Sequence, residues 1–189
     1  MKIVLIDHND SFTYNIIELL KKFKNVDVQV VNYQKIDLKK INEYDKIILS
    51  PGPGLPSDYP KTNALIKEFY RKKPIFGICL GHQMLGEFFG LKIYNLKEVK
   101  HGVSERIIVN DKSLLYQNIS NEISVGLYHS WAVKQITHNS DIKITAFNKD
   151  KVIMSMQHKK LSIFGTQYHI ESFLTPMGEK IMKNFIFNA

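Results

Sequence analysis

The stretch Pro74-Ile75-Phe76-Gly77-Ile78-Cys79-Leu80-Gly81-His82-Gln83 decides the fold of this chain. An apolar run breaks at small residues and continues with helical spacing, which predicts a strand, a sharp turn and a helix. In the pattern G-x-C-x-G, a glycine on each side lets the backbone make that turn and aims the helix N-terminus at the cysteine. Cys79, the only cysteine of the chain, therefore lies where a nucleophile is expected. A buried structural cysteine is the alternative interpretation.

Strands and helices alternate on the N-terminal side of this turn, and shorter strands follow it. Apolar runs predict strands at 2–7, 26–31 and 47–49, with helices at 11–23 and 63–70 and with Asp10 or Ser11 as the cap of the first helix. Beyond residue 90, strand-like pieces at 105–109, 123–128, 142–147, 152–157 and 163–169 precede an amphipathic helix at 175–187. The pattern predicts an α/β fold with an open, mostly parallel sheet, helices on both faces and antiparallel strands in its second half.

Composition narrows the class of protein. With 189 residues, of which 44% are hydrophobic and 23% charged, the chain fits one globular domain over 1–189. No apolar stretch approaches membrane-spanning length and no secretory signal is visible, so we expect a cytoplasmic protein without membrane contact. One unpaired cysteine agrees with a reducing compartment.

The net charge of +8 raises the question of nucleic acid. Arg71 and Arg106 are the only arginines and the lysines are dispersed along the chain, which indicates a solvated lysine surface and not a nucleic-acid site. An acidic protein partner stays open.

A thiol nucleophile needs a base, and position selects His169 among the seven histidines. His169 ends an apolar strand, and in an extended segment Glu171 would point to the same side and could fix the imidazole. The alternative interpretation is that this H-x-E spacing arises by chance. His82 suits the role less because it lies around the helix from Cys79. The other histidines are expected to be loop or surface residues: His8, His101, His129, His138 and His158.

Acyl transfer also needs donors for the developing oxyanion. Leu80 follows the nucleophile and offers its backbone N–H, and the loop Ser50-Pro51-Gly52-Pro53-Gly54 offers a second donor from Gly52 or Gly54. A plain turn is the alternative for this loop. Gln83 lies one helical turn beyond Cys79 and would face the same cavity. No metal-ligand spacing of His and Cys is present, and no cofactor is expected.

Three segments together resemble the class I, triad-type glutamine amidotransferases: Ser50 to Gly54, Gly77 to Gln83 and Gly165 to Ser172. Within that class, Asp7 to Asn15 resembles the opening of the small subunit of anthranilate synthase and aminodeoxychorismate synthase. Tyr128-His129-Ser130 resembles its later glutamine-contacting segment. The resemblance implies Cys79, His169 and Glu171 as the triad, with Gly52 and Leu80 as oxyanion donors. Glutamine would be held around Gly52, Gly54, Gln83, Ser130 and Trp131.

The resemblance further implies hydrolysis of L-glutamine to glutamate and ammonia through a Cys79 thioester, with the ammonia delivered to a chorismate-binding synthase subunit. Three departures from the family pattern concern the turn at the triad and partner contacts: Ile170 stands where proline is usual, Val103 follows Gly102 in place of lysine, and Leu127 replaces an arginine. A stand-alone cysteine hydrolase of related fold and a basic nonenzymatic regulator are the alternatives. The anthranilate and aminodeoxychorismate branches are equally open.

Overall fold

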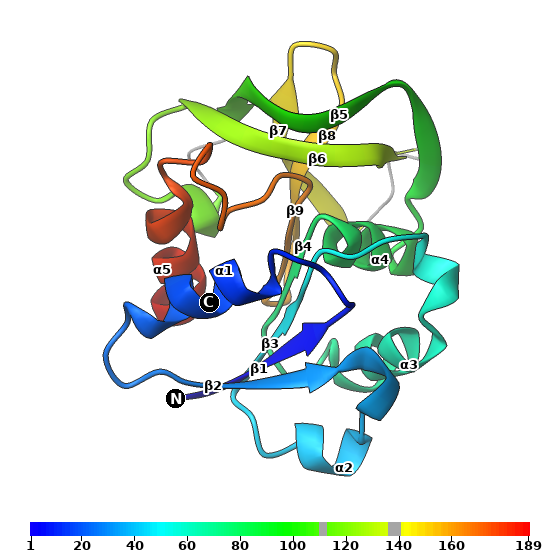
Figure 1. Ribbon diagram of the computed structural model, residues 1–189, viewed down its shortest axis with the longest axis vertical. Helices are drawn as coiled ribbons and strands as arrows, with labels where there is room; N and C mark the ends of the chain where they lie inside the picture. The colour runs from blue at the N-terminus through cyan, green and yellow to red at the C-terminus, as the bar shows by residue number, and fades with distance from the viewer. Residues whose placement is uncertain (110–112, 136–140) are drawn as a thin grey trace.

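A sheet that changes from parallel to antiparallel organises the molecule (Figure 1). The computed structural model describes residues 1–109, 113–135 and 141–189, and in these ranges nine strands form one sheet. The parallel half runs in the order β2 (Asp27–Asn32), β1 (Lys2–Asp7), β3 (Lys46–Leu49), β4 (Ile75–Ile78) and β9 (Ile163–Thr166). The antiparallel half continues with β8 (Ile153–His158), β7 (Ile142–Asn148), β5 (Lys92–Val109) and β6 (Glu122–Lys134).

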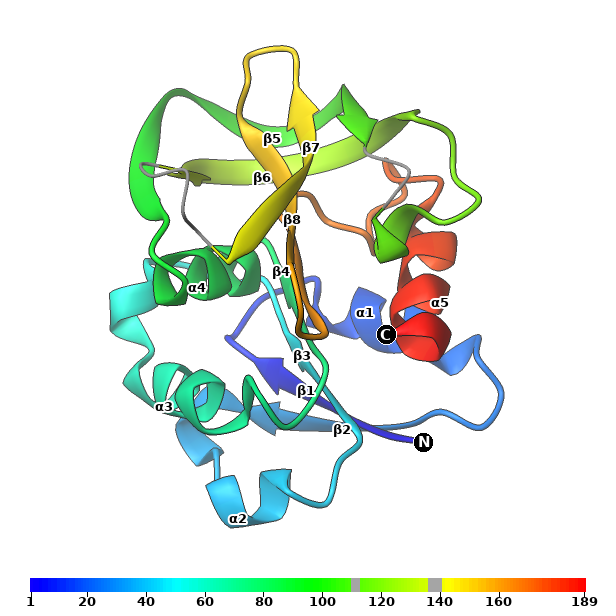
Figure 2. The same cartoon turned by 180° about the vertical axis from the view of Figure 1, so that it is seen from behind.

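Helices cover both faces of the parallel half, as Figures 1 and 2 show from opposite sides. One face carries α1 (Thr13–Lys21) and α5 (Gly178–Asn188), and the other carries α3 (Pro60–Phe69) and α4 (Leu80–Phe88), with the short α2 (Leu38–Ile41) near the sheet edge. Along β1, Ile3 and Leu5 enter the first core, whereas Val4 and Ile6 enter the second. Because both faces are buried, this strand is a continuous apolar run. The predicted fold class is confirmed.

Several element boundaries differ from the sequence-based expectation. Helix α1 begins at Thr13, because Asp10 instead closes the preceding turn: its side chain accepts a hydrogen bond from the Phe12 amide at 2.8 Å. Helix α5 begins at Gly178 and not at 175, since the Gly178 amide donates to the Thr175 carbonyl in a turn.

The largest difference concerns β5, which begins at Lys92, well before the expected 105. Two register shifts against β6, between Asn95 and Lys100 and between His101 and Val103, interrupt the alternation of side chains. The first part of β5 is also mostly polar and exposed, so no apolar period marks it in the sequence.

Four parallel strands end at one edge of the sheet, and the residues just beyond them meet there. These are His8 after β1, Ser50 after β3, Cys79 after β4 and Gln167 after β9. In open α/β sheets this carboxyl edge is where ligands bind. No helix within the described ranges has the length and apolarity needed to cross a membrane.

Candidate active site

Cys79 occupies the tight turn between β4 and α4, in a backbone conformation that side chains rarely adopt (φ 51°, ψ −99°). Such a conformation costs on the order of 1–3 kcal/mol and persists only where surrounding packing enforces it. The flanking glycines provide that packing: a Cβ on Gly77 would lie 2.3 Å from the backbone of Gly81, and one on Gly81 would lie 2.5 Å from the Leu49 carbonyl oxygen. The glycines therefore permit close contact between helix and strands, and the positive φ belongs to the cysteine itself.

The loop from Ser50 to Gly54 packs directly against this turn. A Cβ on Gly52 would lie 2.6 Å from the His8 Cβ and 2.8 Å from Leu80 Cδ2. His8 is fully buried and held in place, because its ring nitrogens lie 3.1 Å from Ser50 Oγ and from Thr62 Oγ1. Only glycine at position 52 lets the predicted oxyanion loop approach the residue that follows the nucleophile.

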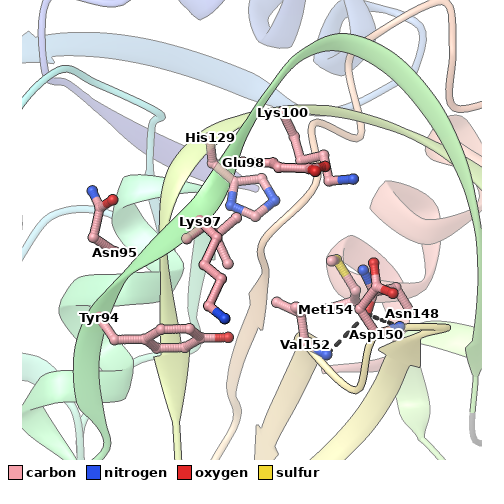
Figure 3. Close-up of a pocket in the computed structure, with 11 residues that line it drawn as sticks. Tyr94, Asn95, Lys97, Glu98, Lys100, His129, Asn148, Asp150, Val152 and Met154 are labelled. Atoms are coloured by element: carbon pink, nitrogen blue, oxygen red, sulfur yellow. Dashed lines mark hydrogen bonds between the residues drawn. The ribbon is translucent and has the colours of Figure 1, made fainter.

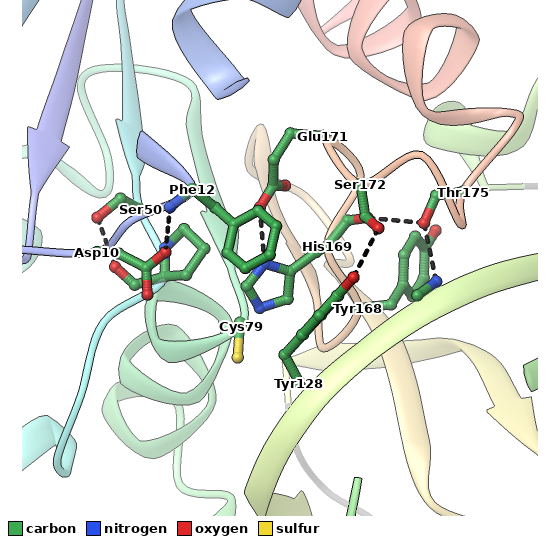
Figure 4. A network of polar contacts seen from close by, with 12 residues as sticks. Asp10, Phe12, Ser50, Cys79, Tyr128, Tyr168, His169, Glu171, Ser172 and Thr175 are labelled. Atoms are coloured by element: carbon green, nitrogen blue, oxygen red, sulfur yellow. Dashed lines mark hydrogen bonds and ion pairs between the residues drawn. The ribbon is translucent and has the colours of Figure 1, made fainter. Parts of the chain in front are cut away.

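His169 and Glu171 are paired, although not in the predicted extended segment. Strand β9 ends at Thr166, and the pair lies in the turn that follows, in which the Ser172 amide donates to the His169 carbonyl. His169 Nδ1 lies 2.6 Å from Glu171 Oε1, with both side chains almost completely buried. Figure 4 shows the imidazole between the Glu171 carboxylate and the Cys79 sulfur.

The surroundings of His169 favour its protonated form. Burial alone would lower the pKa of His169, but the Glu171 carboxylate and, after it, the interaction with the Cys79 sulfur outweigh burial and raise that pKa well above the usual value. Phe12 and Tyr128 pack on the imidazole with ring centroids 5.0 and 4.8 Å away. The ring is thus fixed in position beside the thiol with a carboxylate behind it.

Packing and hydrogen bonds support the predicted triad turn, in which Ile170 stands where proline is usual in the family. Ile170 is 2% exposed, and a Cβ on Gly178 would lie 1.8 Å from its carbonyl oxygen, so α5 packs directly against the turn. Thr175 Oγ1 donates to the His169 carbonyl at 2.7 Å and accepts from the Gly126 amide at 2.9 Å. Packing and hydrogen bonds hold the backbone where a proline ring is usual in the family.

The remaining predicted site residues line a single cavity of about 400 Å³ next to Cys79. Its walls include every residue predicted to bind glutamine or the oxyanion: Gly52, Gly54, Leu80, Gln83, Ser130 and Trp131. Asp58 also lines it and was not predicted, whereas Tyr128 and His129, which line it too, belong to the segment that the resemblance marks as contacting glutamine. Asp58 accepts a hydrogen bond from the Leu55 amide at 2.8 Å, a local contact that closes the turn after Gly54.

Three histidines expected in loops or on the surface are buried, which corrects the prediction: His8, His129 and His158 are 0%, 5% and 6% exposed. His8 follows β1, His129 lies within β6 and His158 ends β8, and packing by residues distant in the sequence covers all three. His101 is exposed as expected, and His138 lies outside the described residues.

His82 is fully buried, and burial lowers its pKa to about 3 despite the nearby Gly165 backbone. A neutral His82 in the core, away from the Glu171 pair, agrees with the expectation that it is not the base.

His129 lines both the site cavity and a second cavity of about 510 Å³, which the first part of β5 also lines (Figure 3). Burial lowers the pKa of His129 to about 4, so the ring is neutral, and Nδ1 lies 2.9 Å from the Trp131 carbonyl oxygen. Nε2 has no hydrogen-bond partner among the described residues. Lys97, Lys100 and Asp150 line this second cavity, which contains none of the predicted triad residues.

The other two departures from the family pattern differ in exposure. Leu127 is completely buried in the core, and Val103 is 40% exposed on β5. In the part of the chain that the structure describes, no group of three or more His, Cys, Asp or Glu side chains is placed to hold a metal ion.

The fold and the site define a class of protein. A cysteine on a strained strand–helix turn, a histidine–carboxylate pair beside it and a glycine loop facing it form the arrangement expected for cysteine-dependent acyl transfer. The family model for class I glutamine amidotransferases matches residues 4–189, and the chain belongs to this family.

Named relatives and a solved structure resemble the chain over nearly its whole length. The chain is 40% identical over 187 residues to anthranilate synthase component 2 of Cyanophora paradoxa, covering 97% of each chain. It is 35% identical over 186 residues to the aminodeoxychorismate/anthranilate synthase component 2 of Bacillus subtilis, covering 97% of this chain and 95% of that one. Among solved structures, a glutamine amidotransferase of Thermotoga maritima superposes with a TM-score of 0.77 at 19% identity, covering 98% of this chain and 80% of that one, which supports the fold.

Proposed function

We propose that this chain is the glutaminase component of a chorismate-using synthase. It hydrolyses L-glutamine to glutamate and ammonia in the cavity beside Cys79, and a partner subunit uses the ammonia. The single observation that carries the proposal is the cavity itself, where the glycine loop, Gln83 and the Ser130–Trp131 segment surround the turn that bears the thiol. The names of the relatives support a synthase partner. They do not distinguish a role in anthranilate synthesis from a role in aminodeoxychorismate synthesis.

In the proposed mechanism, the Cys79 thiolate attacks the side-chain carbonyl carbon of glutamine. A sulfur–carbon bond forms, and the oxygen takes the electron pair and is held by the N–H groups of Leu80 and Gly52. Protonated His169 gives its proton to the amide nitrogen, the carbon–nitrogen bond breaks, and ammonia leaves.

The second half of the reaction reverses these roles. A water molecule loses a proton to His169 and attacks the thioester carbon, after which the thiolate leaves and glutamate is released. Glu171 stabilises the imidazolium in both halves, which agrees with its 2.6 Å contact and its burial. The chemistry requires a reduced thiol, and we place the protein in the cytoplasm for this reason.

The test separates ammonia supply from synthesis. The chain is mixed with each candidate synthase and chorismate, and product formation is measured with glutamine or with ammonium as nitrogen donor. Cys79→Ser is expected to abolish glutamine-dependent product and to leave ammonium-dependent product intact, because the acceptor chemistry belongs to the partner.

A parallel loss of both activities would show a structural defect and contradict the assignment. Ortho-aminobenzoate as product assigns the anthranilate branch, and para-aminobenzoate after lyase treatment assigns the aminodeoxychorismate branch. Glutamate release by the isolated chain is expected to be slow and to rise when synthase and chorismate are added. Full activity alone, unchanged by either synthase, favours a stand-alone hydrolase.

A further inference from the structure

Gln167 presents its side chain to the Cys79 sulfur, and the mechanism above does not use it. Gln167 is 0% exposed, and its backbone amide donates to the Met154 carbonyl at 2.9 Å, so its position is fixed. Gln167 Nε2 lies 3.6 Å from Cys79 Sγ, which is within hydrogen-bond distance for sulfur. A buried amide N–H therefore faces the reacting atom.

The orientation of this amide follows from a chain of hydrogen bonds. Gln83 Nε2 donates to the Trp131 carbonyl oxygen at 2.8 Å, and a carbonyl can only accept, so the NH₂ group of Gln83 must face it. The same NH₂ group donates to Gln167 Oε1 at 3.2 Å. With its oxygen turned toward Gln83, Gln167 must turn its nitrogen toward the sulfur.

The Trp131 carbonyl oxygen fixes the direction of this series of hydrogen bonds. Besides Gln83, it lies 2.9 Å from His129 Nδ1, and His129 is neutral and buried, so its Nδ1–H donates to the same oxygen. The segment that lines the substrate cavity is thereby connected, through two glutamines, to the nucleophile.

An N–H donor at this place favours negative charge on sulfur. Sulfur is anionic before it attacks the amide carbon and again when the thioester breaks, and it is neutral in between. Hydrogen bonds to charged groups are worth about 1.5–3 kcal/mol, roughly tenfold or more in an equilibrium. A donor at sulfur thus increases the thiolate fraction and stabilises the leaving group of the second half-reaction.

We propose that Gln167 is a further catalytic residue, which holds and stabilises the Cys79 thiolate through its Nε2–H, and that Gln83 is the positioning residue that orients it. This inference rests on the proposed function only for the reaction that the thiolate performs. The contact between Gln167 and the sulfur stands without it. Gln83 lines the substrate cavity and Gln167 does not, so substitutions of the two residues are expected to differ in their effect on KM.

The test is the rate of Cys79 alkylation by iodoacetamide as a function of pH, measured by mass spectrometry on the full chain. Gln167→Met keeps the length of the side chain and removes the donor. Its pH profile is expected to move upward by about one pH unit, with alkylation about tenfold slower below the midpoint. Gln83→Met is expected to move the profile in the same direction by a smaller amount, because Gln167 then loses its orientation.

Gln157→Met is the matched control. Gln157 is a partly buried glutamine of β8 whose Oε1 accepts from Ser113 Oγ at 3.0 Å, and within the described ranges no hydrogen bond joins it to Cys79. This variant is expected to keep the wild-type alkylation profile even if it lowers thermal stability. Gln167→Glu, with the native shape and a carboxylate toward the sulfur, gives the same readout with a larger upward shift if the methionine variant does not fold.

Kinetics add a second readout. Gln167→Met is expected to lower kcat for glutamine hydrolysis about tenfold and to leave KM within about twofold, while Gln83→Met raises KM as well. Superimposable alkylation profiles of wild type and Gln167→Met would overturn the inference and leave the proposed function intact. A wild-type Cys79 that reacts no faster than a model thiol would overturn both.

Discussion

Replacing Gly52 by alanine tests how closely the oxyanion loop must approach the nucleophile turn. The added Cβ would lie 2.6 Å from the His8 Cβ and 2.8 Å from Leu80 Cδ2, whereas carbon atoms in contact are about 3.5–4.0 Å apart. His8 cannot move away, because it is fully buried and hydrogen-bonded to Ser50 and Thr62. The loop must therefore shift by about 1 Å, the difference between those distances.

A displacement of this size removes the Gly52 N–H from the oxyanion position. Loss of one such donor costs about 10²- to 10³-fold in kcat, and we expect that loss with a small change in KM, because the cavity walls remain. Overpacking also destabilises the fold by about 1–3 kcal/mol. Glutamate release by the chain in the presence of its synthase, together with thermal unfolding, measures both effects.

Gly90→Ala is the matched control for Gly52→Ala. Gly90 has a φ of +85°, so alanine is strained there, but no heavy atom lies within 4 Å of the added Cβ. We expect a comparable loss of stability with kcat unchanged. A Gly52→Ala variant whose kcat stays within about threefold of wild type would refute the assigned role of the loop.

Three further predictions concern titrating side chains. Glu171→Gln should lower glutaminase kcat by about 10²- to 10⁴-fold, because the His169 imidazolium loses its partner. Since Glu171 raises the pKa of His169, the stability that the variant loses should be largest below about pH 6.5 and shrink as pH rises through the folded-state pKa, as urea unfolding at several pH values can show. His169→Ala should reduce glutamate release about 10²- to 10⁴-fold while ammonium-dependent synthesis continues, and equal losses of both would contradict its role.

Acid stability tests the buried neutral histidine in the same group. Because burial lowers the pKa of His82 to about 3, the wild type should lose up to about 1.4 kcal/mol of stability per pH unit from this residue as pH falls below about 6.5, whereas His82→Leu should flatten that slope. Identical slopes for both proteins would show that His82 is not held neutral.

The parts of the molecule that follow from local pattern were predictable. The apolar run before Cys79, its flanking small residues and the helical spacing after it define β4, the turn and α4, and β1 is recognisable because both of its faces are buried. The pairing of His169 with Glu171 followed from their spacing, although a turn and not a strand brings them together.

What depends on long-range packing was not predictable. The beginning of β5 has no apolar period, since its register against β6 shifts twice. The burial of His8 depends on Ser50 and Thr62, which lie far away in the chain. The contact of Gln167 with the sulfur requires the Trp131 carbonyl and Gln83 to orient two amides, and no sequence motif records an amide orientation. The assignment of 1–189 to a single domain stays a prediction.

The central claim is that Cys79 forms a thioester with the side chain of glutamine. The most direct measurement is intact-protein and peptide mass spectrometry of the chain, mixed with glutamine and synthase and quenched in acid during turnover. We predict a mass gain of one glutamyl group on the peptide that contains Cys79, absent in Cys79→Ser. Continued glutamate formation without any adduct on Cys79, or by the Cys79→Ser variant, would contradict the account.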